Sequence, residues 1–397
     1  MENLFTSTEL THPDFPIFGV ERVLTESFRQ RASDIHIIPL GGYTVTLRVD
    51  GVFRNLANLS REHGQSLLAR MKVLGRMKTF VSTMPQEGRI SLETGESTIE
   101  ARISTFPTVC GEKGVIRIFE GSGTASSLEE LSLSERTMAW MHSMALENQG
   151  VVAICGPSGS GKTTTLYALL SHIHGLRSQF CSIATLEDPV ERITGKFAQT
   201  QVSGDLTFHK GLMGLLRQDP EIIMIGEIRD PDTASVAFEA GLTGHLILTT
   251  LHCDDPHGAI LRLRGLEVTQ GALVNALKGV LCMRLLRKLC TCSIAGRASE
   301  MEGFVEIWKA RNWPFPVSHR VKGAGCEICG GTGYFGRVPV SAALESIDPD
   351  GIQGGVLNES ISFGQETRDL LESGIIDFRE VIRIFPTVNR GGRENPL

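Results

Sequence analysis

Residues 156–164 combine glycines, a lysine and hydroxyl side chains in an order that could bind phosphate. The run reads Gly156-Pro157-Ser158-Gly159-Ser160-Gly161-Lys162-Thr163-Thr164 and fits G-x-x-x-x-G-K-[ST]. Glycines let successive backbone N–H groups converge on phosphate oxygens. We expect Lys162 to contact the β- and γ-phosphates and the Thr163 hydroxyl to bind Mg²⁺. The segment therefore predicts a site for a nucleoside triphosphate.

The segments on either side of this motif agree with that interpretation. An apolar strand is expected at Val151–Cys155, and a helix is expected over Thr164–His172. The motif requires a strand before it and a helix after it. The helix N-terminus adds a partial positive charge that favours a bound phosphate.

A glutamate at the end of another apolar strand is the candidate for activating water. The strand Ile222–Ile225 is followed by Gly226 and Glu227. In many phosphate-loop enzymes an aspartate ends this strand, and here glycine holds that place. We predict that Glu227 orients or polarises the attacking water, with a solvated strand-end carboxylate as the alternative. Asp230 precedes Pro231 and is predicted to cap a helix rather than to act in catalysis.

Two adjacent acids, Glu187 and Asp188, follow the apolar run Cys181–Leu186. The carboxyl ends of parallel strands meet at the ligand crevice, so these side chains are expected near the phosphates or the metal. Neighbouring residues of a strand point in opposite directions, so one is expected to face the metal and the other the water or loop. A turn signalled by Asp-Pro is the alternative interpretation.

Two histidines flank the next apolar run, Leu246–Leu248. His245 opens the strand and His252 lies beyond it. Histidine can donate a hydrogen bond to phosphate or sense its presence, so both are candidate site residues. A packed polar residue at a strand end is the alternative for each.

The elements that must position these residues suggest two domains. With 397 residues, the chain is long enough for two to three domains. Residues 1–18 are expected to form a loose lead-in, and 19–120 a small α+β domain. Residues 121–127 are rich in Gly and Ser and predict a linker. Residues 128–397 alternate apolar strands with helices, which predicts an α/β domain with a parallel sheet.

Composition and charge exclude several classes of protein. The net charge is −6, and 41% of the residues are hydrophobic. This indicates a globular protein with no overall attraction for nucleic acid, so no direct nucleic-acid partner is expected. Neither a signal peptide nor a membrane-spanning run is found, which predicts a cytoplasmic protein with reduced thiols.

The nine cysteines fall into two groups. Five are single residues, expected to act as small buried hydrophobes: Cys110, Cys155, Cys181, Cys253 and Cys282. The other four form the close pairs Cys290/Cys292 and Cys326/Cys329. Four thiolates in two pairs suit a tetrahedral structural Zn²⁺, with unligated reduced thiols as the alternative. The C-x-C spacing of the first pair is the less usual one for a chelate.

Four segments together resemble the secretion ATPase superfamily of type II secretion and type IV pilus motors. They are the phosphate loop, 184–191 (ATLEDPVE), 216–230 (LRQDPEIIMIGEIRD) and 243–252 (TGHLILTTLH). The resemblance extends into the first domain through 32–37 (ASDIHI), 48–51 (RVDG), 85–89 (PQEGR) and 102–108 (RISTFPT).

The resemblance implies a RecA-like ATPase domain preceded by a PAS-like domain, with an inserted tetracysteine module at 290–329 that supports Zn²⁺. ATP would bind between the two domains, with Arg89 and Arg102 reaching the phosphates and Arg117 a weaker candidate. It also implies a homo-hexamer on the inner face of the cytoplasmic membrane, where it moves an inner-membrane platform protein. The motor would serve type II secretion or pilus assembly.

The sequence departs from the family pattern in several places. Cys253-Asp254-Asp255-Pro256 follows His252, where Thr-Asn-Asp-Ala is common. We also expect a short form that lacks the family's extra N-terminal docking domain. Two alternative functions stay open at this point: a DNA-uptake or conjugation motor, and a nucleotide-dependent scaffold with little turnover, for which Gly226 would be the sign.

Overall fold

The chain is organised as two compact units, Met1–Thr124 and Ala125–Leu397. The computed structural model describes residues 4–94, 97–119, 127–177, 181–297, 304–345 and 359–386. The predicted linker lies outside the described residues except for Ser127. Each unit is described by itself.

The first unit contains three helices and six strands within its described residues. In chain order they are α1 (Ser7–Leu10), α2 (Phe15–Arg29), β1 (Ala32–Pro39), β2 (Tyr43–Val49), β3 (Val52–Leu59), α3 (Arg61–Leu74), β4 (Gln86–Thr94), β5 (Ser97–Thr108) and β6 (Gly111–Phe119). The lead-in expected over 1–18 is wrong in part, because α1 and the first turn of α2 lie there. Thr6 and Glu9 form a capping box at α1, and Pro16 occupies the first turn of α2, where a missing N–H costs nothing.

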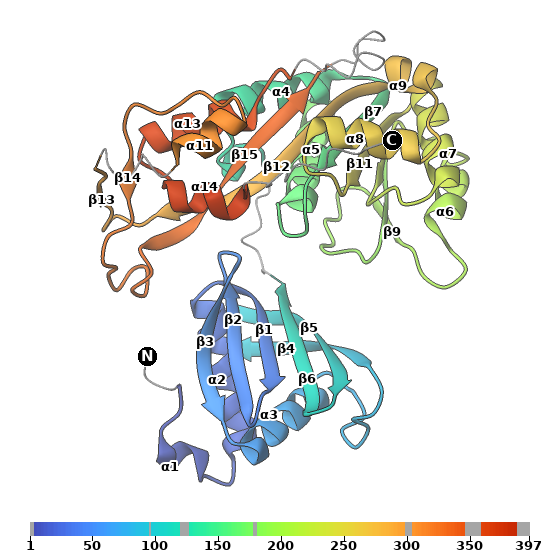
Figure 1. Cartoon of the computed structure of the whole chain (residues 1–397). Helices are drawn as coiled ribbons and strands as arrows, with labels where there is room; N and C mark the ends of the chain where they lie inside the picture. Colours follow the sequence, from blue (N-terminus) through green and yellow to red (C-terminus); the bar gives the residue numbers. More distant parts are fainter. Residues whose placement is uncertain are drawn as a thin grey trace, which may run out of the picture. The chain divides into compact units, whose positions relative to one another are not determined.

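The six strands form one antiparallel sheet in the order β3-β2-β1-β6-β5-β4 (Figure 1). Alternation along the strands explains its two faces. Ile35, Ile103 and Ile116 are fully buried with the apolar sides of α2 and α3, whereas every second residue points to the opposite face. That opposite face carries the arginines considered below.

The second unit is built on a seven-stranded sheet. Its elements are η1 (Glu129–Leu131), α4 (Glu135–Leu146), β7 (Gly150–Cys155), α5 (Lys162–Leu176), β8 (Ile183–Glu187), β9 (Ala198–Gln201), α6 (Phe208–Leu215), β10 (Ile222–Ile225), α7 (Pro231–Leu242), β11 (Leu246–Leu251), α8 (Pro256–Gly265), α9 (Gln270–Ala276), β12 (Leu277–Leu289), β13 (Ile294–Ala295), α11 (Val305–Ala310), β14 (Arg320–Val321), β15 (Tyr334–Leu344), α13 (Phe363–Glu372) and α14 (Phe378–Ile384).

The strand order is β15-β12-β7-β11-β10-β8-β9, and only the β12–β15 pair is antiparallel. Strands β7, β10 and β11 are buried on both faces, which is why each reads as a continuous apolar run. Helices α4 and α5 contribute to the core on one face, and α6, α7, α8 and α9 to the core on the other. The prediction of an α/β domain preceded by a smaller α+β domain is confirmed.

Candidate functional site: a phosphate loop at the carboxyl edge of the sheet

The phosphate loop joins the end of β7 to the start of α5, as its sequence predicts. Gly159 and Gly161 have φ angles of 75° and 93°, in the left-handed region that glycine adopts without strain. A Cβ added at Gly159 would meet no atom within 4 Å, and at Gly161 it would meet only Leu285 at 3.8 Å. The loop therefore has open space beside its backbone, which fits phosphate oxygens.

Lys162 is the first residue of α5 and is buried. Its Nζ donates to the carbonyl oxygens of Gly156 at 2.8 Å and Pro157 at 3.0 Å, so the ammonium is folded back over the loop. Burial lowers its pKa, and the nearby Glu227 carboxylate opposes that shift. The Lys162 charge thus lies where phosphate oxygens could replace the two carbonyl contacts.

Glu227 follows β10, and β10 pairs with β11 in parallel register. One carboxylate oxygen of Glu227 forms an ion pair with Arg229, and the other lies 3.9 Å from His252 Nε2. The Glu227 side chain is only 16% exposed. Burial and the Lys162 charge lower the pKa of His252, so that imidazole is neutral near pH 7.

The carboxyl edge, by which we mean the ends of β7, β10 and β11, therefore brings together Lys162, Glu227 and His252. Two arginines that sequence reasoning missed lie at this edge or beside it. Arg229 stands two positions after Glu227, a spacing that could have been noticed. Arg284 interrupts the apolar strand β12, and its guanidinium donates to the Asp254 carboxylate at 2.8 Å in the loop after His252.

The adjacent acids Glu187 and Asp188 differ in exposure. Asp188 is exposed, whereas Glu187 is only 3% exposed. The Glu187 carboxylate accepts hydrogen bonds from the Tyr167 hydroxyl, from Thr185 Oγ1 at 2.6 Å and from Gln199 Nε2 at 3.2 Å. Glu187 thus ties α5 to β8 and β9, and its catalytic role stays a prediction.

His245 is not brought to the phosphate loop. It precedes β11 at the amino edge of the sheet, where Gly150 N donates to its carbonyl oxygen at 2.9 Å. Its Nδ1 lies 3.2 Å from the Ala240 carbonyl oxygen. The six residues of β11 span about 20 Å, so His245 and His252 occupy opposite edges.

Arg89, Arg102 and Arg117 form one cross-strand row on the sheet of the first unit, which we call the arginine row. Arg89 is paired with Arg102 between β4 and β5, and Arg102 with Arg117 between β5 and β6. Directly opposed side chains of an antiparallel pair project from the same face, with Cβ atoms about 5 Å apart. Three positive charges thus gather on the face that α2 and α3 leave uncovered.

The tetracysteine module brings all four predicted ligands together. Sulfur separations are 3.6 Å for Cys290–Cys326, 3.8 Å for Cys326–Cys329 and 4.0 Å for Cys292–Cys329. A tetrahedron with Zn–S bonds of about 2.3 Å places its sulfurs ~3.8 Å apart. The uneven C-x-C pair therefore does not prevent closure of the cluster.

Backbone donors support the anionic form of one sulfur. The N–H groups of Cys326 and Gly333 each lie 3.2 Å from Cys329 Sγ. Burial opposes ionisation of Cys329, but these N–H groups and the neighbouring thiols outweigh it and lower its pKa to about 6. A metal-binding thiolate needs this stabilisation. The residues present fit a structural metal ion.

The expectation for the five single cysteines is confirmed for Cys155 and Cys282, which are buried. Cys253 and Cys181 are half-buried. For Cys110 the expectation is wrong, because this residue is exposed at the turn that joins β5 to β6. A hairpin tip has no core to bury a side chain.

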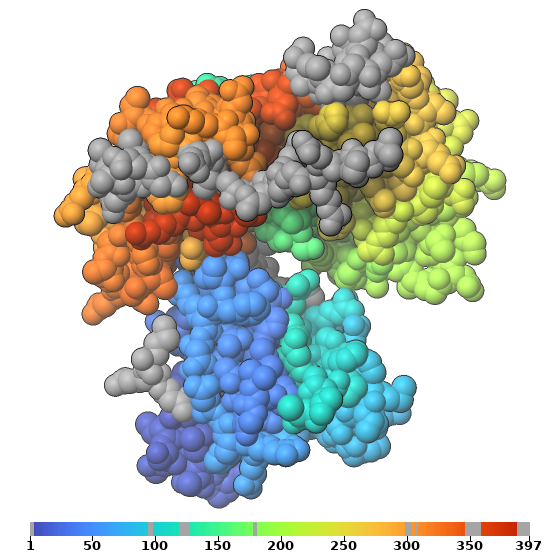
Figure 2. Space-filling model, in the orientation of Figure 1, coloured from blue at the N-terminus to red at the C-terminus, as the bar shows by residue number. Residues whose placement is uncertain are grey.

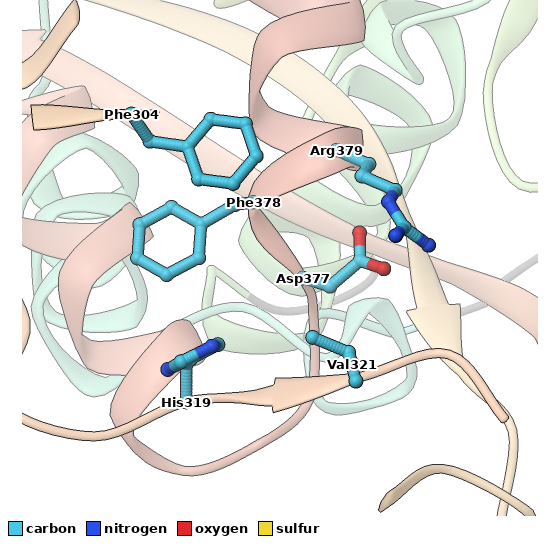
Figure 3. A pocket seen from close by; sticks show the side chains of 6 residues that line it. All are labelled: Phe304, His319, Val321, Asp377, Phe378 and Arg379. Carbon is cyan, nitrogen blue, oxygen red and sulfur yellow. The ribbon is translucent and has the colours of Figure 1, made fainter. Parts of the chain in front are cut away.

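A pocket of about 200 Å³ lies beside the start of α14 (Figure 3). It is lined by Phe304, His319, Val321, Asp377, Phe378 and Arg379. Phe304 and Phe378 stack with centroids 5.0 Å apart. Residues 304–345, orange in Figure 2, form part of this unit's surface.

Comparisons with known proteins agree with this geometry. The family described as "Type II/IV secretion system protein" matches residues 14–377. A type II secretion system protein E from Pectobacterium carotovorum subsp. carotovorum is 36% identical, covering 94% of this chain and 76% of the relative. One from Pseudomonas aeruginosa is 38% identical, covering 91% and 71%. A type IV pilus assembly ATPase, TfpB, from Acinetobacter baylyi is 35% identical, covering 92% and 65%.

Two solved structures share the fold. The ATPase DotB of Legionella pneumophila has a TM-score of 0.66 at 19% identity, covering 93% of this chain and 95% of that one. The pilus retraction motor PilT with bound ADP has a TM-score of 0.58 at 22% identity, covering 93% and 97%. No helix in the described ranges has the length and apolarity to cross a bilayer.

Proposed function

The chain belongs to the type II/IV secretion system protein family and is an ATPase, and from this premise we propose that it powers type II secretion or type IV pilus assembly. In this proposal it works as a homo-hexameric ring on the inner face of the cytoplasmic membrane and moves an inner-membrane platform protein. The observation that carries the proposal is the convergence of Lys162, Glu227 and His252 beside the phosphate loop.

The open loop supports binding of the ATP phosphates. Backbone N–H groups of residues 159–163 and the N-terminus of α5 face a phosphate there. The Lys162 ammonium exchanges its two carbonyl contacts for phosphate oxygens. The Thr163 hydroxyl, half-exposed on the first turn of α5, is the proposed protein ligand of Mg²⁺. The ion would supply positive charge that neutralises the phosphate oxygens.

Glu227 is proposed to orient a water molecule for attack on the γ-phosphorus. The water oxygen forms the new P–O bond, its proton passes to the Glu227 carboxylate, and the bond to the β,γ-bridging oxygen breaks. Arg229 and neutral His252 hold the carboxylate in place. Glu187 keeps α5 and β8 together behind the loop and contributes to the site through that framework.

The arginine row is proposed to deliver positive charge to the γ-phosphate. Arg102 is partly exposed and pairs with Glu87, itself 59% exposed, so water competes for this ion pair and a phosphate can replace it. Charge that develops on the phosphate in the transition state is stabilised by guanidinium groups placed there in advance. Arg89 and Arg102 are the first candidates.

The tetracysteine module is proposed to hold one structural Zn²⁺ through Cys290, Cys292, Cys326 and Cys329. Support comes from the sulfur separations of 3.6 to 4.0 Å. Elemental analysis of the purified chain should find about one zinc per chain, and Cys329→Ser should lose it. Stable protein without zinc and with unchanged unfolding temperature after chelation would contradict this assignment.

Phosphate release from Mg²⁺-ATP by the purified full chain tests the proposed activity. The wild type should turn over, and omission of Mg²⁺ should stop turnover. Addition of membranes that contain the platform protein should raise the rate and recruit the chain to the vesicles. Wild-type protein that binds ATP without releasing phosphate would contradict the motor proposal and favour a nucleotide-dependent scaffold.

A further inference from the structure

A charged residue interrupts the apolar strand β12 beside the phosphate loop. Strand β12 pairs with β7 as far as Cys282 and then continues past the end of β7, so Arg284 lies alongside the loop. The neighbouring residue agrees with this position, because a Cβ built on Gly156 would lie 2.6 Å from the Met283 carbonyl oxygen. Burial lowers the pKa of Lys162, and the nearby Arg284 charge adds to that shift.

The Arg284 side chain is only 9% exposed, and its partners lie on one face of the sheet. Alternation along β12 directs it away from the Met283 side chain, which accepts from Thr165 of α5 at 3.4 Å. Helix α8 packs on β12, and Asp254 lies in the loop that leads into this helix. Arg284 Nη2 donates to the Asp254 carbonyl oxygen and to Asp254 Oδ1, both at 2.8 Å, and Nη1 donates to the Met283 carbonyl oxygen at 3.0 Å. A buried guanidinium needs such acceptors, because an unpaired charge away from water is costly.

The loop 252–255 joins β11 to α8 and begins with His252. The His252 imidazole is 56% exposed, and its Nε2 lies 3.9 Å from Glu227 Oε2, which is too far for a hydrogen bond to hold it there. Its place beside Glu227 therefore depends on how the backbone of the loop is fixed. Arg284 donates to that backbone at Asp254, two residues after His252.

The two halves of the Arg284 contact differ in strength. The Asp254 carboxylate is 90% exposed, so water competes for the ion pair. The bond to the Asp254 carbonyl oxygen comes from a charged donor, and such bonds are stronger than neutral ones. Because the donor is buried on a central strand, the loop is tied to a rigid part of the sheet.

We propose that Arg284 is a positioning residue for ATP hydrolysis, which holds the loop 252–255 so that His252 stays beside Glu227. The inference rests on the proposed function and extends the site to β12. Arg284 acts through His252, so its loss should cost no more than the loss of His252 itself. The expected effect on kcat is therefore about 2- to 10-fold.

The experiment measures kcat, KM and the pH–rate profile for Mg²⁺-ATP with the full chain, together with its thermal unfolding. Arg284→Met removes the charge and keeps most of the side-chain volume, and it should lower kcat about 2- to 10-fold with little change in KM. The fall in rate on the acid side should move to lower pH, because a displaced His252 no longer meets Glu227 when it is protonated. In the His252→Ala background, Arg284→Met should have no further effect on kcat.

Arg287→Met is the matched control. Arg287 lies on the same strand, and its Nη2 donates to the buried Glu380 carboxylate at 2.8 Å. Arg383 also donates to that carboxylate, so Glu380 stays paired in the variant. Arg287→Met should lower the unfolding temperature and keep both kcat and the pH–rate profile, which separates a loss of stability from a loss of position.

Should Arg284→Met fail to fold, Asp254→Ala provides the second variant, since its exposed side chain supports no core. It should displace the acid side of the profile in the same direction, with a smaller loss of kcat because the carbonyl contact remains. A normal kcat with an unmoved profile in the folded variant would overturn this inference alone. So would a loss that persists in the His252→Ala background, since it would point to Lys162 instead. A wild type without turnover would overturn the proposed function and this inference with it.

Discussion

The two ends of β11 differ in what surrounds them, although each carries a histidine from the same short segment. At the carboxyl end, His252 lies beside Glu227 and close to Lys162. At the amino end, His245 contacts the Ala240 carbonyl in the last turn of α7. A six-residue strand separates them by about 20 Å. Nearness in sequence therefore does not place two residues in one site.

The electrostatic difference between the two ends is equally clear. The carboxyl edge brings together the buried Lys162 ammonium, the half-buried Glu227 carboxylate and the Arg229 guanidinium that contacts it. Burial at this edge lowers the pKa values of Lys162 and His252. Perturbed groups that cluster in this way mark functional sites. Turnover of variants at each end of β11 tests whether the two ends also differ in function.

The largest effect is expected from Lys162→Ala. It removes the charge that meets the β- and γ-phosphates, so turnover should fall by at least about 100-fold, with ATP binding weakened as well. Phosphate release and titration with a fluorescent ATP analogue measure the two losses separately. Near-normal turnover in this variant would remove the carboxyl edge from consideration as the hydrolytic site.

Glu227→Gln should come next, with a loss of about 100-fold in kcat and retained ATP binding, because only water activation is lost. Asp232→Asn is its control, since that exposed acid lies on the first turn of the neighbouring α7. Steady-state kinetics of the two variants should separate them clearly. Equal losses would mean that charge near the sheet edge matters, and not the position of Glu227.

A smaller loss, about 2- to 10-fold, is expected from His252→Ala. Its lowered pKa keeps His252 neutral at pH 7, and protonation as the pH falls below that pKa would pair it with Glu227 and weaken the base. Wild-type turnover should therefore be level near neutral pH and fall on the acid side. A pH–rate profile should show this fall displaced to lower pH in His252→Ala, and an identical profile would contradict the role of His252.

The smallest effect is expected from His245→Ala. The lost Nδ1 contact with the Ala240 carbonyl should lower the unfolding temperature slightly, while kcat stays within about twofold of wild type. Differential scanning calorimetry and steady-state turnover provide the comparison. A loss of kcat equal to that of His252→Ala would remove the distinction between the two ends of the strand.

Much of this arrangement could be predicted from the sequence, because local rules govern it. The phosphate loop between Val151–Cys155 and its helix, the cap at Asp230 and each of the two close cysteine pairs follow from residue types at short spacing. The burial of Glu187 could not be predicted, since it depends on Tyr167 and Gln199 from other elements.

Contacts between residues distant in sequence explain why the remaining features could not be predicted. Asp34 and Arg117 are 83 residues apart, and only the β1–β6 register makes them partners. Arg284 is a charged residue inside an apolar strand, and the partner that explains it, Asp254, lies on a loop 30 residues earlier in the chain. Sheet order therefore carries information that motif spacing does not contain.

Phosphate release from Mg²⁺-ATP, measured side by side for Glu227→Gln and His245→Ala in the full chain, tests the assignment of the site most directly. We expect that Glu227→Gln binds ATP but releases almost no phosphate, and that His245→Ala turns over at nearly the wild-type rate. Retained turnover in Glu227→Gln, or an equal loss in His245→Ala, would contradict the placement of hydrolysis at the carboxyl edge.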